Sequence, residues 1–165
     1  MKQEFLHIIS ENQGIIHKVC GIYCDTREDR EDLFQEIVSQ LWKSYPTFRH
    51  ESKVSTWMYR VALNTAITQF KKEKRRPDQH AVEHQHLQYE DSYYDSAIEE
   101  EIKMLHKAIS KLSGIEKSIV LLYLEEKKHE EIADIVGITQ NYVRVKMNRI
   151  KARLKKIMEE DGHGT

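Results

Sequence analysis

Hydrophobic side chains recur at intervals of three and four residues along two stretches near the start of the chain, Phe5–Tyr23 and Leu33–Trp42. This spacing places apolar side chains on one face of an α-helix, so both stretches are predicted to be amphipathic helices. The second helix is expected to start near Asp29 or Arg30. It should end before Pro46, because the residue preceding a proline is pushed out of the helical region. The polar residues that follow predict a loop.

A third helix is predicted from Ser55 to the basic run before Pro77. Ser55 is suited to the N-cap position, because its hydroxyl can accept a hydrogen bond from a free backbone N–H of the first turn. The helix ends in five cations, Lys71, Lys72, Lys74, Arg75 and Arg76. Such a run is suited to the phosphates of a nucleic acid, and a merely solvated helix end is the alternative.

Residues 77–101 contain no lysine or arginine and many carboxylates. This composition predicts an acidic, flexible linker between two helical parts of the chain. Three linker histidines, His80, His84 and His86, have metal-binding side chains. A flexible segment offers no fixed coordination geometry, so no metal site is predicted there.

Helical periodicity resumes at Ile102, and breaks at Ser113-Gly114 and at Gly137 predict three successive helical segments. The last break has the spacing of a helix-turn-helix, since Gly137 follows Ala133 by four residues and Val143 follows six residues later. A small alanine lets two helices cross closely, and glycine permits the left-handed turn between them. This part of the chain is therefore predicted to contain a helix-turn-helix.

The segment after the turn is strongly basic. Between Thr139 and Lys156 it has no acidic residue, and its cations are Arg144, Lys146, Arg149, Lys151, Arg153, Lys155 and Lys156. A positive helix end that offsets its own dipole and an ordinary helical hairpin are the alternatives. Because the spacing, the turn glycine and the cations coincide on one segment, DNA binding is the favoured interpretation.

The composition supports a helical protein. Charged residues make up 32% of the 165 positions and hydrophobic residues 39%, with six Gly and two Pro, which disfavours a turn-rich β architecture. The expected fold class is all-α, with two small helical domains joined by the acidic flexible linker and the helix-turn-helix in the C-terminal domain. The net charge of −1 averages this linker against two basic segments.

No membrane span and no cofactor or metal site are predicted. No apolar run approaches the roughly 20 residues that cross a bilayer, and the first residues lack the apolar core of a signal peptide. Direct membrane insertion is therefore not expected. The expected location is the cytoplasm. A possible metal-binding pattern, H-x2-C-x3-C, is formed by His17, Cys20 and Cys24. It lacks a fourth metal ligand. Free thiols on a partly buried helix face are the expected state.

Two blocks of sequence stand in order on either side of the linker. The first reads DREDLFQEIVSQLWKSYPTFRHESKVSTWMYRVALNTAITQFKKEKRR, and the second reads LHKAISKLSGIEKSIVLLYLEEKKHEEIADIVGITQNYVRVKMNRIKARLKK. They resemble bacterial sigma factors of the extracytoplasmic-function (ECF) group of the sigma-70 family. The first block matches the group's D-x-E-D-L-x-Q-E helix, aromatic-rich segment, T-W-L-Y-R-I-A-x-N helix and basic end. The second is similar to its C-terminal DNA-binding domain.

The resemblance implies an alternative sigma factor that directs core RNA polymerase to promoter DNA, assists promoter melting and is not an enzyme. It implies a domain over 1–76 that binds core polymerase and the −10 element, a linker over 77–101, and a domain over 102–160 that binds the −35 element. Two departures stand out. The family often has a proline after the leucine of Leu112-Ser113-Gly114, and Val145 replaces a commoner polar residue in the recognition helix.

Candidate site residues follow from the matching positions. Core polymerase would contact Asp32, Gln35, Glu36 and Trp42, although Trp42 is equally suited to anchor its own domain. The −10 element would contact His50, Glu51, Ser52, Lys53, Arg60, Asn64, Lys71, Lys72, Lys74, Arg75 and Arg76. The −35 element would contact Gln140, Asn141, Arg144, Lys146, Arg149, Lys151 and Arg153.

The resemblance also implies an anti-sigma protein as a partner, which in this group is often membrane-bound. Two other classes of protein stay open. A one-component regulator would bind an operator without polymerase, and would leave the first block unexplained. A helical nuclease would need acidic metal ligands clustered on a fixed scaffold. Here Glu28, Asp29, Glu31 and Asp32 lie on one amphipathic helix start. Two observations separate these classes. Copurification with polymerase would indicate a sigma factor, and metal-dependent cleavage would indicate a nuclease.

Overall fold

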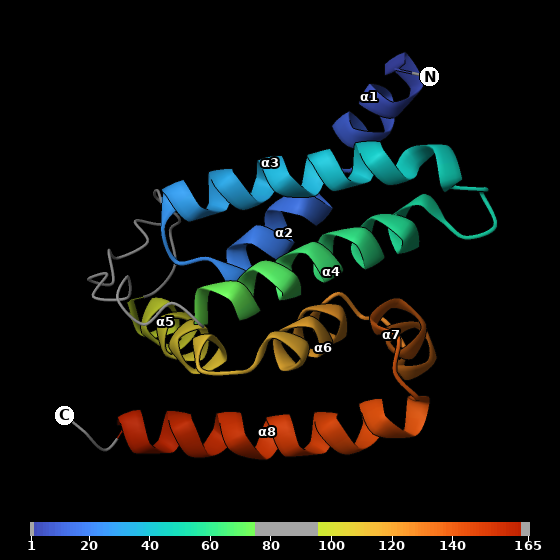
Figure 1. Ribbon diagram of the computed structural model, residues 1–165. Helices are drawn as coiled ribbons and strands as arrows, with labels where there is room; N and C mark the ends of the chain where they lie inside the picture. Colours follow the sequence, from blue (N-terminus) through green and yellow to red (C-terminus); the bar gives the residue numbers. More distant parts are fainter. Residues whose placement is uncertain (1, 75–95, 163–165) are drawn as a thin grey trace.

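The computed structural model describes residues 2–74 and 96–162, and the regular structure in these ranges is helical (Figure 1). The first range contains α1 (Lys2–Glu11), α2 (Gln13–Tyr23), α3 (Arg27–Ser44), a 3-10 turn (Tyr45–Thr47) and α4 (Val54–Lys74). The second contains α5 (Ser96–Ser110), α6 (Gly114–Leu124), α7 (His129–Val136) and α8 (Gln140–Gly162). The all-α prediction is confirmed. Most of the predicted linker lies outside the described residues, as do its histidines, Arg75 and Arg76.

The stretch predicted as the first helix forms two helices, because the chain turns at Asn12. The Asn12 Nδ2 atom donates a hydrogen bond to the Ile8 carbonyl at 2.8 Å, and the Asn12 backbone N–H donates to the Ile9 carbonyl at 3.1 Å. Local bonds from an asparagine side chain to the backbone compete with helix propagation. The periodic pattern of apolar residues continues through this turn, so it did not reveal the break.

Helices α3 and α4 start earlier than predicted. Thr26 caps α3, since its Oγ1 atom accepts a hydrogen bond from the Asp29 backbone N–H at 3.1 Å. Asp29 and Arg30 therefore lie inside the helix. α4 begins at Val54, so Ser55 lies in its first turn and is not the N-cap.

The C-terminal part has four helices where the sequence predicted three segments. α5 begins at Ser96, so residues 96–101, assigned to the linker, are helical. A further break separates α6 from α7, where Glu126 has a left-handed backbone with φ 61°. A non-glycine residue seldom takes this conformation, and no glycine or proline marks the turn.

The N-terminal part is built around α2, α3 and α4. Ile16, Leu33 and Ile37 are at most 2% exposed and fill the space between these helices. α1 crosses the end of α3, where the ring centroids of Phe5 and Trp42 are 4.9 Å apart in an edge-on contact.

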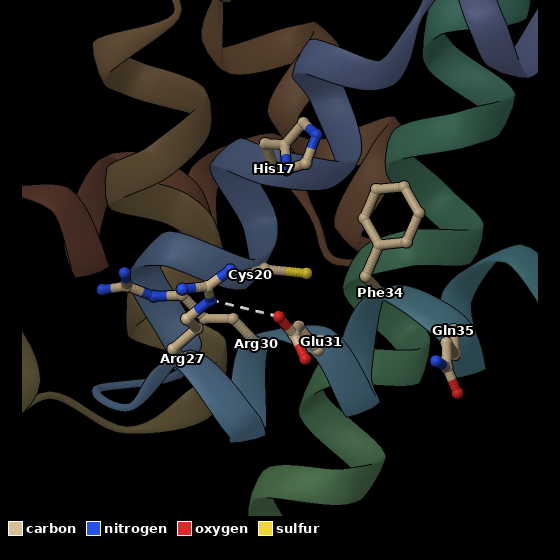
Figure 2. Close-up of a pocket in the computed structure, with 7 residues that line it drawn as sticks. All are labelled: His17, Cys20, Arg27, Arg30, Glu31, Phe34 and Gln35. Carbon is tan, nitrogen blue, oxygen red and sulfur yellow. Dashed lines mark hydrogen bonds and ion pairs between the residues drawn. The ribbon is translucent and has the colours of Figure 1, made fainter.

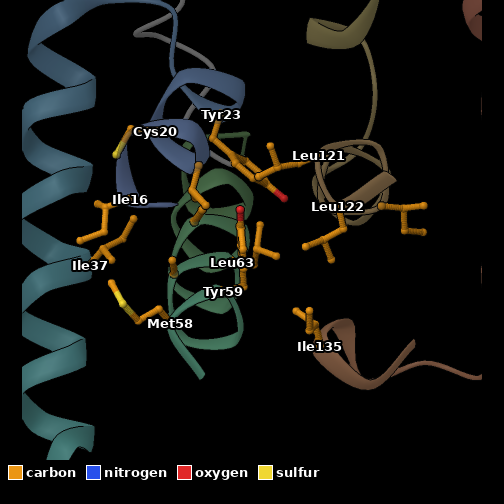
Figure 3. Packing of buried hydrophobic residues seen from close by; sticks show 14 of the residues in the cluster. Ile16, Cys20, Tyr23, Ile37, Met58, Tyr59, Leu63, Leu121, Leu122 and Ile135 are labelled. Atoms are coloured by element: carbon orange, nitrogen blue, oxygen red, sulfur yellow. The ribbon is translucent and has the colours of Figure 1, made fainter. Parts of the chain in front are cut away.

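The N-terminal and C-terminal parts share one hydrophobic core (Figure 3). Leu122 of α6 is 0% exposed and Ile135 of α7 is 3% exposed. Both helices pack on α4, which contributes Tyr59 and Leu63 to the same cluster (Figure 3). We call this contact between α4 and α2 on one side and α6 and α7 on the other the interdomain seam.

Polar contacts also cross the interdomain seam. The Tyr23 hydroxyl donates a hydrogen bond to the Gly114 carbonyl at 2.5 Å, and the Lys18 Nζ atom lies 2.7 Å from the Glu125 carboxylate. Burial raises the pKa of Tyr23, so its phenol stays protonated and remains a donor. The backbone approaches closely here, because a Cβ atom at Gly114 would lie 3.3 Å from the Phe70 ring.

A capping box fixes the start of α6. The Ser113 hydroxyl accepts from the Glu116 backbone N–H at 3.3 Å, and the Glu116 carboxylate accepts from the Ser113 backbone N–H at 3.0 Å. Burial by itself would raise the pKa of Glu116. The hydrogen bonds with Ser113 and the charges of Lys146 and Arg153 outweigh burial and lower it.

Glu116→Gln is expected to lower the free energy of unfolding by about 1 kcal/mol at neutral pH, because a neutral amide replaces a charge-assisted acceptor. A carboxylate whose pKa is depressed in the folded state stabilises at neutral pH, and this stabilisation is lost as the pH falls through that pKa. The difference between wild type and variant should therefore vanish in acid. Urea unfolding of both proteins between about pH 7 and about pH 3 measures this difference in stability. Exposed Glu159→Gln is the control, and an equal difference at every pH would contradict the assignment.

Candidate nucleic-acid interface

Helices α7 and α8 form the predicted helix-turn-helix, with Gly137 at the turn. Gly137 has φ 83°, in the left-handed region that favours glycine. The backbone N–H groups of Gly137 and Ile138 donate to the Ala133 carbonyl at 2.9 and 3.1 Å. Ala133 is 9% exposed, and Ile132 and Val143 are fully buried between the helices. The turn therefore fixes the direction of α8 relative to α7.

Two glycine-to-alanine substitutions are expected to have opposite effects. Gly137→Ala should lower the free energy of unfolding by about 1 kcal/mol, because alanine is strained at positive φ. A Cβ atom there would have nothing within 4 Å, so the loss is conformational and not steric. Gly21→Ala, inside α2 and also with open space, is the matched control and should stabilise by several tenths of a kcal/mol. Urea unfolding followed by circular dichroism measures both, and losses of equal size would contradict the prediction.

The first turn of α8 presents the predicted base-contacting residues. The Thr139 Oγ1 atom accepts a hydrogen bond from the Tyr142 backbone N–H at 3.1 Å and caps the helix. Gln140, Asn141 and Arg144 are exposed. The Arg144 Nη2 atom donates to the Asn141 Oδ1 atom at 2.8 Å, so the guanidinium and the amide are held side by side.

Two of the other predicted −35 cations differ in their surroundings. Arg149 is exposed on α8. Arg153 is turned toward its own part of the chain, with its Nη1 atom 3.4 Å from the Glu116 carboxylate and its Nη2 atom donating to the Lys111 carbonyl at 3.3 Å. The structure thus gives Arg153 a role in holding α8 against α6.

Lysines of α8 also lie over tyrosine rings. The Lys151 Nζ atom is 4.6 Å from the centre of the Tyr123 ring, and the Lys146 Nζ atom is 5.9 Å from that of Tyr142. Contacts of this kind at exposed sites contribute about 0.5–1 kcal/mol. They orient the two ammonium groups along the helix surface.

Aromatic contacts hold the loop before α4. Phe48 stacks on Trp57 with ring centroids 4.6 Å apart, and its centroid lies 4.5 Å from that of His50. His50 has φ 57°, a backbone strain of the kind that occurs at functional sites. The other predicted −10 residues of the loop lie at the surface and are Glu51, Ser52 and Lys53.

Helix α4 carries the remaining predicted −10 residues on different sides. Asn64 is exposed. Arg60 lies at the interdomain seam, where its Nη2 atom is 3.3 Å from the Asp134 carboxylate of α7. Three of the five predicted cations lie within the described residues, in the last turns of α4. They are Lys71, Lys72 and Lys74.

A polar groove of about 510 Å³ lies between α3 and α4. It joins Glu36, predicted to bind polymerase, to Asn64 and Lys72, predicted to bind the −10 element. Its other lining residues are Gln40, Thr65, Thr68 and Gln69. The sequence pattern missed these four, because isolated uncharged residues on a helix surface give no signal until two helices place them together.

Helix α3 presents the predicted polymerase contacts. Asp32 and Gln35 are exposed, and Glu36 is half-buried. Trp42 is 46% exposed even though it contacts Phe5 of α1. Its indole therefore anchors α1 and also leaves an apolar surface open to a partner.

A pocket of about 320 Å³ opens beside this face, between α2 and α3 (Figure 2). Its lining residues are His17, Cys20, Arg27, Arg30, Glu31, Phe34 and Gln35. The Arg27 Nε atom lies 3.2 Å from the Glu31 carboxylate (Figure 2). Burial raises the pKa of the Cys20 thiol to about 11 despite the nearby Arg30 charge. The thiol therefore stays protonated at neutral pH, which makes it a poor nucleophile.

Comparison with known proteins extends this picture. The family model described as Sigma-70 region 2 matches residues 8–76, and the one described as Sigma-70, region 4 matches residues 102–154. The RNA polymerase sigma factor SigV of Bacillus subtilis (strain 168) is 28% identical, over 93% of this chain and 90% of its own length. The ECF RNA polymerase sigma-E factor of Haemophilus influenzae is 27% identical, over 93% of this chain and 87% of its own.

Two solved structures share the fold. The sigma factor RpoE from Bartonella quintana, in complex with the anti-sigma factor NepR, has a TM-score of 0.69 and 21% identity, covering 96% of each chain. CnrH, in complex with the cytosolic domain of CnrY, has a TM-score of 0.69 and 14% identity, covering 98% of this chain and 91% of its own. At these identities the likeness concerns the fold.

The two family models and the curated relatives define the class of protein, a transcription initiation factor whose C-terminal part carries the helix-turn-helix. The chain belongs to the sigma-70 family of RNA polymerase sigma factors, in its ECF group. The family resemblance of the sequence is thereby confirmed. Among residues 2–74 and 96–162, no helix combines the length and the apolar character that crossing a membrane requires.

Proposed function

We propose that this chain is an alternative sigma factor that brings core RNA polymerase to a specific set of promoters, assists melting and performs no catalysis itself. The observation that supports this most is the helix-turn-helix, whose α8 exposes Gln140, Asn141 and Arg144 at its start. The first residues of a recognition helix reach base edges in the major groove. Residues 102–160 thus bind the −35 element.

Residues 1–76 bind core polymerase and the −10 element in this proposal, and residues 77–101 connect the two units. The exposed face of α3, with Asp32, Gln35 and Trp42, contacts polymerase. The groove between α3 and α4 lies beside that face and receives the unpaired −10 strand. Unstacking a base costs a few kcal/mol, which hydrogen bonds in the groove and backbone contacts with lysines at the end of α4 offset.

The Arg60–Asp134 pair separates when Arg60 binds DNA. The two side chains are 40% and 71% exposed, and an ion pair this exposed contributes less than about 1 kcal/mol. A phosphate contact replaces it without a large net loss. The pair itself is therefore a small obstacle to DNA binding by Arg60, and the buried contacts of the interdomain seam are what hold the two parts together.

An anti-sigma protein is the proposed regulatory partner. RpoE and CnrH, which share this fold, were captured with the anti-sigma factor NepR and with the cytosolic domain of CnrY. A partner of this kind would cover the polymerase-binding face of α3 and the DNA-binding face of α8. The site of action is the cytoplasm, where polymerase and promoters are present.

Transcription in vitro from a pool of genomic promoters tests the proposal. Core polymerase with the chain should produce new starts that share two upstream elements, and core polymerase alone should not. Arg144→Ala should reduce these transcripts about tenfold or more, as expected for a residue that contacts a base edge. Lys103→Ala, which removes an exposed cation from α5, is the matched control and should leave them unchanged.

The competing one-component regulator gives a different result. In that case the chain would bind duplex DNA alone but would neither bind core polymerase nor create new starts. Cleavage of DNA that depends on a divalent metal would instead indicate a nuclease.

A further inference from the structure

Over residues 141–152, the side of α8 that faces away from its hydrophobic core is uncharged. Val143, Met147 and Ile150 point inward and are at most 4% exposed. With about 3.6 residues per turn, the positions on the opposite side of the helix are Asn141, Val145, Asn148 and Ala152. All four are exposed. α8 itself lies along the edge of the molecule, with the other helices on one side of it (Figure 1).

Cations flank this uncharged stripe on both sides. Arg144 and Lys155, three helical turns apart, follow one edge, and Arg149 and Lys156 follow the other. A helix in the major groove has phosphates along both walls and base edges on the floor. The two rows of cations therefore match the walls, and the uncharged stripe matches the floor.

Val145 is the one member of the stripe with a sizeable apolar side chain, and it is 36% exposed. On the helix surface its neighbours three and four residues away are the polar Asn141, Asn148 and Arg149 and one exposed aromatic residue, Tyr142. The apolar surface that Val145 and Tyr142 form is therefore small and bordered by polar residues. The C5-methyl group of thymine is the apolar group in the major groove. Asn141 and Asn148 on either side carry the amide group that pairs with adenine edges.

We propose that Val145 is a specificity-determining residue that reads a thymine of the −35 element through contact with its C5-methyl group. This inference rests on the proposed function, because it requires α8 to enter the major groove at a promoter. It explains why an aliphatic residue is exposed in the middle of a cationic helix.

Removal of the thymine methyl group from the DNA tests the contact directly. The holoenzyme, full chain with core polymerase, is used to select a promoter duplex from a random pool. Each thymine of the −35 element is then replaced in turn by deoxyuridine, which lacks only the methyl group. At one of these thymines, the replacement should lower the affinity of the wild-type holoenzyme for the duplex about fourfold, the factor expected when one methyl group is no longer buried.

Val145→Ala should narrow the difference in affinity between the thymine and deoxyuridine duplexes, because its single methyl group makes a smaller apolar contact with the thymine methyl. Lys156→Ala is the matched control. It should weaken binding to both duplexes, keep the preference for thymine and reduce the salt dependence by about one phosphate contact. Val145 lies at the surface, and unfolding by urea verifies that the variant is folded.

Two results would overturn the inference while leaving the sigma role intact. In one, Val145→Ala keeps the wild-type preference for thymine. In the other, no thymine of the element responds to loss of its methyl group. Failure of the proposed function is a different outcome, in which wild-type holoenzyme selects no duplex beyond those that core polymerase selects.

Discussion

Leu122→Ala is expected to lower the free energy of unfolding by about 3 kcal/mol and to destabilise both parts of the chain together. Leu122 is 0% exposed at the interdomain seam, and a leucine-to-alanine change at such a site removes buried surface and leaves a cavity. Both tryptophans, Trp42 and Trp57, are in the N-terminal part. Their fluorescence therefore reports unfolding of that part, while circular dichroism reports helices of both. In urea the two signals should shift together.

Leu124→Ala is the matched control, because this leucine lies in the same helix and is 56% exposed. It should change the stability by less than about 0.5 kcal/mol. If Leu122→Ala shifted only the circular dichroism transition and left the tryptophan transition in place, the two parts would unfold independently. The shared hydrophobic core would then contribute little to the N-terminal part.

Reversing the charges of Asp32 and Glu36 together, each to lysine, is expected to weaken binding to core polymerase about a hundredfold. Both carboxylates lie on the α3 face proposed to contact polymerase, and placing like charges in an interface costs several kcal/mol. Competition with labelled wild-type chain for core polymerase, in the absence of DNA, measures the loss. The unfolding midpoint should change little, because Asp32 is exposed and Glu36 is only half-buried.

Glu159→Lys with Glu160→Lys is the control for the charge-reversed pair. It reverses the same number of exposed charges at the far end of α8 and should leave polymerase binding unchanged. Equal loss in both variants would mean that overall charge, and not the α3 face, governs the affinity.

Local sequence signals were sufficient for the helix-turn-helix. The spacing of Ala133, Gly137 and Val143 reflects contacts between residues that are close along the chain, and the structure has the left-handed turn at Gly137 that the glycine permits. The all-α class followed from periodicity and composition in the same way. The family itself was evident from two ordered motif blocks, since few other families reproduce both.

Contacts between distant residues gave no such signal. The hydrogen bond from Tyr23 to Gly114 and the Arg60–Asp134 pair join residues far apart in sequence, and no periodic pattern contains them. Arg153 illustrates this for the site, because no sequence signal indicated that its guanidinium lies 3.4 Å from Glu116, and its contact with the −35 element stays a prediction. The groove between α3 and α4 likewise exists only once two helices are side by side.

The close approach at Gly114 has a consequence for the exchange of modules between sigma factors. A C-terminal unit from another member of the family, grafted after α4, would fit most easily with an equally small residue where Gly114 faces the Phe70 ring. A Cβ atom there would lie 3.3 Å from that ring, so the Phe70 side chain would have to shift by a few tenths of an ångström. Chimeric factors should therefore keep the packing of α6 on α4 most readily when the grafting boundary carries this glycine with it.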